Sequence, residues 1–242
     1  MIVDNPAARL LKILELGKTY NVEANCKNSW KQLLAVQGDS NSELMSKLGK
    51  VMDLPQEAIS LLEILGEGDI DMHAHWVDQV SRGFMEQNLN SKWQTFINHI
   101  DDHSIRYLKM CARVLDVQSK ESLLSAEQLG EIRAEIMEVL NTVRGSSLEI
   151  SIKQFLIRKL HQILVAIDEY DITGSVPIFT AIESTYGHAV SNPNFRRSIQ
   201  DSELAETLWG SLNKVSTVIS LATGLPELAS AGAILLASVS AA

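Results

Sequence analysis

Four histidines lie near one another in the sequence and are of a type that binds metal ions. His99 and His103 are four residues apart in the stretch NHIDDH (98–103), and His73 and His75 precede them. Histidines at positions i and i+4 share one helix face, which is the spacing with which many helices bind zinc. One hypothesis is therefore a metal site that uses these four imidazoles.

The residues between the histidines do not complete a zinc-peptidase motif. In H-E-x-x-H a glutamate follows the first histidine, and here that position is Ile100. In H-x-x-E-H a glutamate precedes the second histidine, and here that position is Asp102. In both motifs the missing glutamate is the residue that acts as the general base. We therefore expect no metal or other cofactor, and we expect the histidines to flank a packed helix, with His73 or His75 hydrogen-bonded between neighbouring helices.

The helical wheel of residues 91–116 supports this structural interpretation. One stripe at helical spacing, expected to face the core, consists of Trp93, Ile97, Ile100, Ser104, Leu108, Cys111 and Leu115. His103 lies at the edge of this stripe and His99 farther round. Asp102 lies nearly opposite it, where we expect an ion pair with Arg106 four residues on.

Other catalytic patterns are missing from the sequence. There is no G-x-S-x-G, no G-x-x-x-x-G-K-[ST] and no G-x-G-x-x-G. The stretch 145–147, Gly-Ser-Ser, could bind an anion at a helix start, but helix caps commonly have this composition. Cys26 and Cys111 are isolated, as is typical of buried cysteines in a reducing cytosol. We expect a cytoplasmic protein that is not an enzyme.

The charge distribution disfavours nucleic acid as a partner. The formal net charge is −9; residues 1–50 contain seven basic and five acidic residues, residues 51–145 eight and sixteen, and residues 146–242 six and nine. No third of the chain has the concentrated basic surface that phosphate binding requires.

Residues typical of helix starts and ends recur along the whole chain. They predict an all-α fold, an irregular bundle of about ten helices. Asn5, Ser40 and Ser125 have the positions of N-caps, and Pro55 is expected to begin a helix. Alternating strand patterns are almost absent, and aromatic residues make up only 5%. Expected helices cover about 6–17, a short one from 29, 41–54, 55–65, 72–88, 91–116, 126–143, 148–170, 177–189, 202–222 and one from 226.

The chain is expected to form one continuous structural unit with three parts: an N-terminal helical subdomain (1–66), a main bundle (72–212) and an apolar C-terminal segment (213–242). The last 28 residues contain one charge, Glu227, and Gly224 and Pro226 interrupt them. A helix that is apolar all round is enclosed by protein or placed in lipid. The predicted partner or membrane interface consists of Val215, Val218, Ile219, Leu225, Leu228, Leu235, Leu236 and Val239.

Four stretches resemble a widespread group of all-helical bacterial proteins. They are NPAARLLKILELGK, LMSKLGKVMDLP, FINHIDDHSIRYL and IDEYDITGSVPIFTAIESTYGHA. The resemblance covers about residues 5–190 and implies a bacterial cytosolic protein associated with defence or stress, with no activity to carry over to particular residues.

Three functions follow as hypotheses. The first is a non-enzymatic protein that binds another protein or itself in phage defence or a stress response. The second is a membrane-active effector that uses residues 215–242. The third is a metalloprotein or enzyme centred on His99 and His103.

Overall fold

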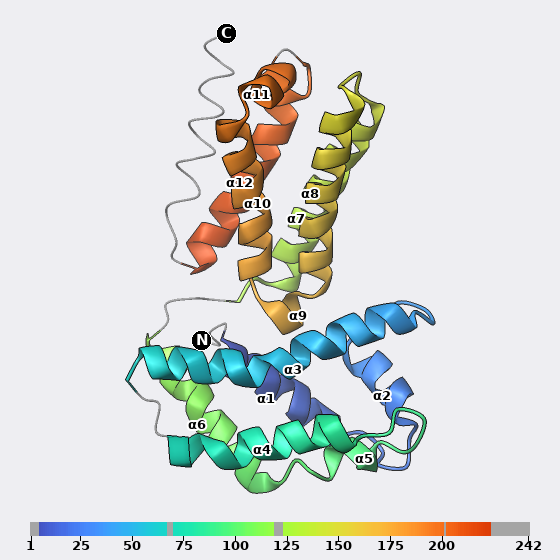
Figure 1. The fold of residues 1–242 in the computed structure, drawn as a ribbon, viewed down its shortest axis with the longest axis vertical. Coiled ribbons are helices and arrows are strands. Elements are labelled where there is room, and N and C mark those ends of the chain that lie inside the picture. The colour runs from blue at the N-terminus through green and yellow to red at the C-terminus, as the bar shows by residue number, and fades with distance from the viewer. Residues whose placement is uncertain (1–4, 67–69, 119–122, 201, 224–242) are drawn as a thin grey trace. The chain divides into compact units, whose positions relative to one another are not determined.

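The amino-acid sequence folds into twelve α-helices across the residues that the structure, a computed structural model, describes: 5–66, 70–118, 123–200 and 202–223. No strand occurs within these ranges, where the extended backbone forms only an isolated bridge between Asn25 and Lys92. The all-α fold is therefore confirmed. The contacts between helices divide the chain into two compact units, Met1–Lys120 (unit 1) and Glu121–Ala242 (unit 2) (Figure 1).

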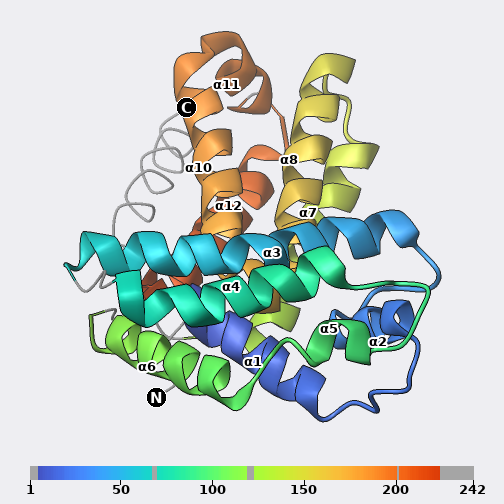
Figure 2. The same ribbon diagram turned by 60° about the horizontal axis from the view of Figure 1, so that its bottom comes forward.

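Unit 1 is a ring of four long helices with two short ones beside it. The helices are α1 (Pro6–Lys18), α2 (Cys26–Leu33), α3 (Asn41–Ile64), α4 (Ile70–Glu86), α5 (Gln94–Ile97) and α6 (Asp102–Gln118). Helix α1 contacts α3 and α6, and α4 contacts the same two helices, so α1, α3, α4 and α6 enclose one interior (Figure 2).

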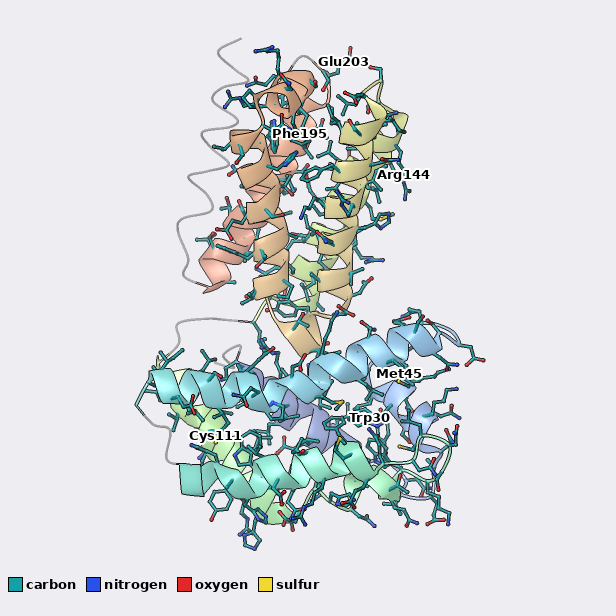
Figure 3. The ribbon with its side chains drawn as sticks, in the orientation of Figure 1. Trp30, Met45, Cys111, Arg144, Phe195 and Glu203 are labelled. Atoms are coloured by element: carbon teal, nitrogen blue, oxygen red, sulfur yellow. The ribbon has the colours of Figure 1, made fainter. Side chains whose placement is uncertain are left out.

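The interior of unit 1 contains a cluster of aromatic rings. Trp30 lies in contact with the rings of Phe84, Trp93 and Phe96, at centroid distances of 5.7, 5.0 and 4.6 Å. Figure 3 labels Trp30 within this unit. The indole nitrogen of Trp93 donates to the carbonyl of Gly17 at 2.8 Å, which ties the loop after α4 to the end of α1.

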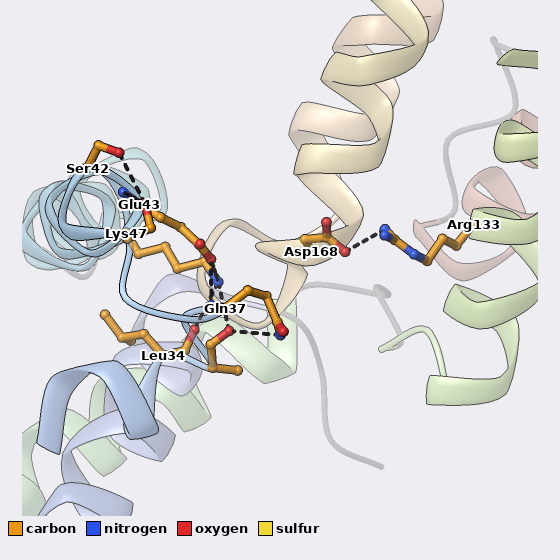
Figure 4. Close-up of polar contacts among 9 residues, drawn as sticks. Leu34, Gln37, Ser42, Glu43, Lys47, Arg133 and Asp168 are labelled. Atoms are coloured by element: carbon orange, nitrogen blue, oxygen red, sulfur yellow. Dashed lines mark hydrogen bonds and ion pairs between the residues drawn. The ribbon is translucent and has the colours of Figure 1, made fainter. Parts of the chain in front are cut away.

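A buried lysine connects α3 to the turn after α2. The Lys47 side chain is 3% exposed; its Nζ donates to the carbonyls of Leu34 and Ala35 and lies 3.0 Å from a carboxylate oxygen of Glu43 (Figure 4). Ala35 has a φ of 48°, in the left-handed region that costs a residue with a Cβ. The ammonium group thus satisfies carbonyls that this strained turn directs inward.

Unit 2 is a second ring of four helices. It contains α7 (Ala126–Gly145), α8 (Ile150–Asp168), α9 (Tyr170–Thr173), α10 (Val176–Ser191), α11 (Pro193–Gln200) and α12 (Ala205–Thr223). Helix α8 contacts α7 and α10, and α12 contacts the same two helices. The interior is mainly aliphatic, and its fully buried side chains include Ile136, Val139, Leu156, Ile163, Ile178, Ile182, Leu208, Leu212 and Ile219.

The predicted N-caps are confirmed, and each has its expected partner. The side-chain oxygens of Asn5, Ser40 and Ser125 accept hydrogen bonds from the third amide beyond them, and Ser125 forms a complete capping box with Gln128.

Three predicted helix boundaries are wrong. The short helix expected from Ser29 is α2, which begins at Cys26 because the Asn25 side chain caps it. Pro55 lies inside α3, which continues to Ile64, because Val51, Leu54 and Ala58 bury one continuous face that compensates for the amide hydrogen that proline lacks. The predicted helix 91–116 is two helices, because the Asp101 side chain accepts a hydrogen bond from the Ser104 amide and begins α6 anew.

The division into units also differs from the predicted subdomains 1–66, 72–212 and 213–242. Helices α4 and α6 pack against α1 and α3, so the link at 66–71 lies within unit 1 instead of between domains.

Candidate functional site

The four histidines lie along the contact of α4 with the start of α6, and each has its own partner. His73, 8% exposed, places Nδ1 3.3 Å from the Cys111 sulfur. His99 lies 3.5 Å from a carboxylate oxygen of Glu86. The ring of His103 meets that of His75 at right angles with the centroids 6.5 Å apart. The side chains therefore join helices in pairs and do not point at a common centre.

Asp101 connects His75 to the first turn of α6. One carboxylate oxygen lies 2.9 Å from Nε2 of His75, and the other accepts the Ser104 amide at 2.6 Å. Partial burial raises the pKa of Asp101, but these hydrogen bonds outweigh burial and lower the pKa to about 2. The stretch NHIDDH is thus a helix cap with an attached helix–helix contact.

Asp102 does not have the partner expected for it. It lies on the exposed side, as predicted, but its carboxylate accepts from Nζ of Lys18 at 2.8 Å, and the same ammonium group donates to the carbonyl of Ile100. The pair joins α6 to the end of α1. Arg106 contributes only a weaker electrostatic attraction to Asp102.

Within the described ranges no group of three histidine, cysteine or acidic residues could hold a metal ion. The two thiols are also poorly placed for nucleophilic chemistry. Burial raises the pKa of Cys111 to about 11 and raises that of Cys26. Cys111, labelled in Figure 3, lies against His73 within unit 1. These thiols act as small apolar core residues.

The predicted interface at the C-terminal end is only partly within the described chain. Val215 and Ile219 are 1% and 0% exposed and belong to the core of unit 2, while Val218 is partly buried against it. Leu225, Leu228, Leu235, Leu236 and Val239 lie outside the described residues. A partner or a lipid bilayer could reach Val215 and Ile219 only if α12 left the core. No helix in the described part of the chain combines the length and apolar character that crossing a membrane requires.

Unit 2 contains an open polar cleft of about 930 Å³. It lies between the turn that joins α7 to α8 and the link from α11 to α12, and Figure 3 labels one of its lining residues, Glu203. The lining residues are Thr142, Gly145, Ser146, Ser147, Leu148, Glu149, Ser198, Ser202, Glu203 and Leu204. Ser146 and Ser202 donate to the carbonyls of Val143 and Ile199, and no histidine is among the lining residues.

The outer face of α6 presents apolar side chains that do not belong to the core. Tyr107, Met110 and Val117 are 37%, 48% and 83% exposed, and Val114 is half-buried. Together with His103 they recur at intervals of four, three, four and three residues, the spacing of a coiled-coil seam. We name Tyr107, Met110, Val114 and Val117 the α6 stripe.

Basic residues border the α6 stripe along one side. If Tyr107 and Val114 take the a positions and Met110 and Val117 the d positions, Arg106 and Arg113 are both at g positions, seven residues apart. The residues at the opposite flanking e positions, Ser104 and Cys111, are buried toward the core. One flank of the stripe is therefore open and basic, and the other is closed.

Sequence reasoning missed the α6 stripe because it assigned a single apolar face to this helix. The heptad spacing of 107, 110, 114 and 117 was the available signal, and it was overlooked beside the stronger core stripe.

No family model matches this sequence, no curated protein matches it, and no solved structure matches it. The resemblance to helical bacterial proteins remains a prediction from four stretches of sequence.

Proposed function

We propose that this chain is a non-enzymatic helical protein that acts by binding another protein, and that the α6 stripe is its docking face. The observation that carries the proposal is the exposure of Tyr107, Met110 and Val117 at heptad spacing on a helix whose opposite face is in the core. Helices with anchors at such spacing dock along a partner helix or into a groove.

The contacts of the histidine side chains support a binding role over a catalytic one. His73, His75 and His99 contact Cys111, Asp101 and Glu86. These contacts hold α4 to the segment that begins α6, which fixes the helix that presents the stripe. The polar groups of unit 1 therefore support a rigid surface, and rigid helical surfaces lose less entropy on binding.

The proposal includes the setting that the sequence suggests, a bacterial cytoplasm and a defence or stress response. The isolated buried thiols, neither of which forms a disulfide, support a reducing compartment.

Site-specific photocrosslinking in the producing cell tests the docking role. A photoreactive phenylalanine analogue at Met110 should give a protein adduct of defined mass. The same analogue at Met85, 76% exposed on α4 and away from the stripe, is the matched control. Equal labelling from both positions, or no adduct at Met110 under the conditions in which the protein acts, would contradict the proposal.

A further inference from the structure

We propose that the partner docked on the α6 stripe is an acidic amphipathic helix of another protein. This inference rests on the proposed function and specifies its partner. It is carried by the charge of the open flank, where Arg106 and Arg113 lie on one side of the apolar seam at equivalent heptad positions. A helix that lies along the stripe places its own flanking side chains opposite these two guanidinium groups.

The charges around the stripe leave the two arginines available. Arg113 is exposed, and no interaction with it is found among the described residues. Arg106 is exposed and only weakly attracted to Asp102, whose carboxylate is bonded to Lys18. Guanidinium groups are suited to carboxylates because they can donate two parallel hydrogen bonds.

The remaining charged groups on this face already have partners within unit 1. Lys109 lies 3.9 Å from Glu15 on α1, and Asp116 accepts a hydrogen bond from Asn5. On the α4 side, Asp78 pairs with Arg82 and Asp101 with His75. The arginines thus determine the charge that an incoming helix meets at the open flank.

A second copy of α6 is a poor occupant. In an antiparallel pair the g positions of the two helices face each other, so Arg106 and Arg113 would meet arginines. In a parallel pair they would face the e positions, but Ser104 and Cys111 are buried and unavailable. Like charges across the seam disfavour the first arrangement, and the packing of α6 into unit 1 prevents the second.

The apolar C-terminal segment of this chain is also a poor match for the basic flank. Its last 28 residues contain one acidic residue, Glu227, so it cannot pair with two arginines seven residues apart. Charge complementarity therefore favours a helix from a different protein, with acidic residues at one flank of its apolar seam.

Two synthetic helical peptides provide the probe. Both have the same leucine heptads; one has glutamate at every flanking position and the other has lysine. Titrated with the full chain and followed by fluorescence anisotropy, the glutamate peptide should bind about tenfold more tightly or better, since each charge pair is exposed and contributes modestly. This preference should shrink as salt is added.

Charge-reversed and apolar variants separate the two proposals. Arg106→Glu combined with Arg113→Glu should weaken binding of the glutamate peptide about tenfold and favour the lysine peptide. Arg197→Glu, at an exposed arginine of unit 2, is the matched control and should change nothing. Met110→Asp should abolish binding of both peptides while Met85→Asp should not.

Each outcome decides between the proposals. If Met110→Asp abolishes binding but charge reversal has no effect, or both peptides bind equally to the native chain, the acidic partner is wrong and the docking face stands. If Met110→Asp leaves binding intact, both proposals fail. A homodimer that Met110→Asp dissolves, measured by sedimentation of the chain alone, would identify a second copy as the occupant and overturn the inference.

Discussion

Unit 1 and unit 2 are both rings of four helices, yet their interiors are built differently. In unit 1 a contiguous cluster of aromatic rings lies within an otherwise aliphatic core, and buried polar groups join separate elements, as Trp93 does with Gly17 and Lys47 with Leu34. In unit 2 the core is mostly isoleucine, leucine and valine. The Tyr170 hydroxyl accepts a buried hydrogen bond from the Leu124 amide, while ion pairs such as Arg133–Asp168 lie at the surface (Figure 4).

The difference is one between directional and non-directional packing. An aliphatic core is stabilised in proportion to buried area and accepts substitutions that conserve volume. A core with buried donors and acceptors requires each partner. A buried polar group without a hydrogen bond has lost its hydration in water and gained nothing in return, which destabilises the fold. We therefore expect unit 1 to be the more sensitive to conservative changes.

The largest expected effect is that of Trp93→Ala. The ring is fully buried against Trp30 and Phe96, and its loss also removes the indole donor to the Gly17 carbonyl. The free energy of unfolding should fall by about 3–5 kcal/mol. Urea unfolding followed by tryptophan fluorescence measures it, with Trp30 and Trp76 still reporting on unit 1. A loss no larger than that of an exposed substitution such as Met85→Ala would contradict this account of the core.

Lys47→Met compared with Lys214→Met tests the role of buried polar bonds. Methionine keeps most of the side-chain volume, but at position 47 it removes the donor to Leu34 and Ala35, which should cost about 1–3 kcal/mol. Lys214 pairs with Glu135 at the surface of unit 2, so its replacement should cost much less. If chemical denaturation gave equal decreases in the free energy of unfolding for the two variants, the proposed distinction between the units would be wrong.

Glycine-to-alanine substitutions should have opposite signs in the two units. A Cβ on Gly83 would lie 3.1 Å from the Phe96 ring, so Gly83→Ala should destabilise unit 1 by about 1 kcal/mol or more. A Cβ on Gly130, inside α7, meets nothing within 4 Å, so Gly130→Ala should stabilise unit 2 by about 0.5–1 kcal/mol through helix propensity. Thermal unfolding gives both signs, and a stabilising Gly83→Ala would show that the aromatic cluster has room to adjust.

The smallest expected effect concerns Asp101 and pH. Its folded pKa of about 2 lies below the usual value near 4, so its contribution is complete above pH ~4 and is lost as the pH falls toward 2. Asp101→Asn keeps an oxygen that can cap α6 but removes the carboxylate charge bonded to His75, an exposed pair, so it should lower stability at neutral pH by about 0.5 kcal/mol or less, and the difference from the native chain should vanish at acidic pH. Stability curves of the two proteins that stay parallel from pH 7 to pH ~2 would contradict this assignment.

Much of the fold could be predicted from local chemistry. Every residue of the predicted stripe from Trp93 to Leu115 is buried, because burial follows helical periodicity even where the helix is interrupted. The interruption itself could not be predicted so easily. Asp101 can lie within a helix or cap one, and its contact with His75, 26 residues away, favours the cap.

The candidate site was harder to predict than the fold. The sequence drew attention to the histidines, whose chemistry is recognisable, and these serve to connect helices. The α6 stripe consists of ordinary apolar residues such as Met110 and Val117, which resemble core residues until the packing shows that they are exposed.

The central claim, that the α6 stripe is the docking face, is tested most directly by methionine methyl spectroscopy. The chain contains seven methionines, among them Met110 on the stripe, Met85 on α4, and Met45 and Met52 exposed on α3. On titration with the glutamate peptide, the methyl resonance of Met110 should shift in proportion to occupancy while those of Met85, Met45 and Met52 stay in place. Shifts at Met45 and Met52 with an unmoved Met110 would place the binding surface on α3 and contradict the account.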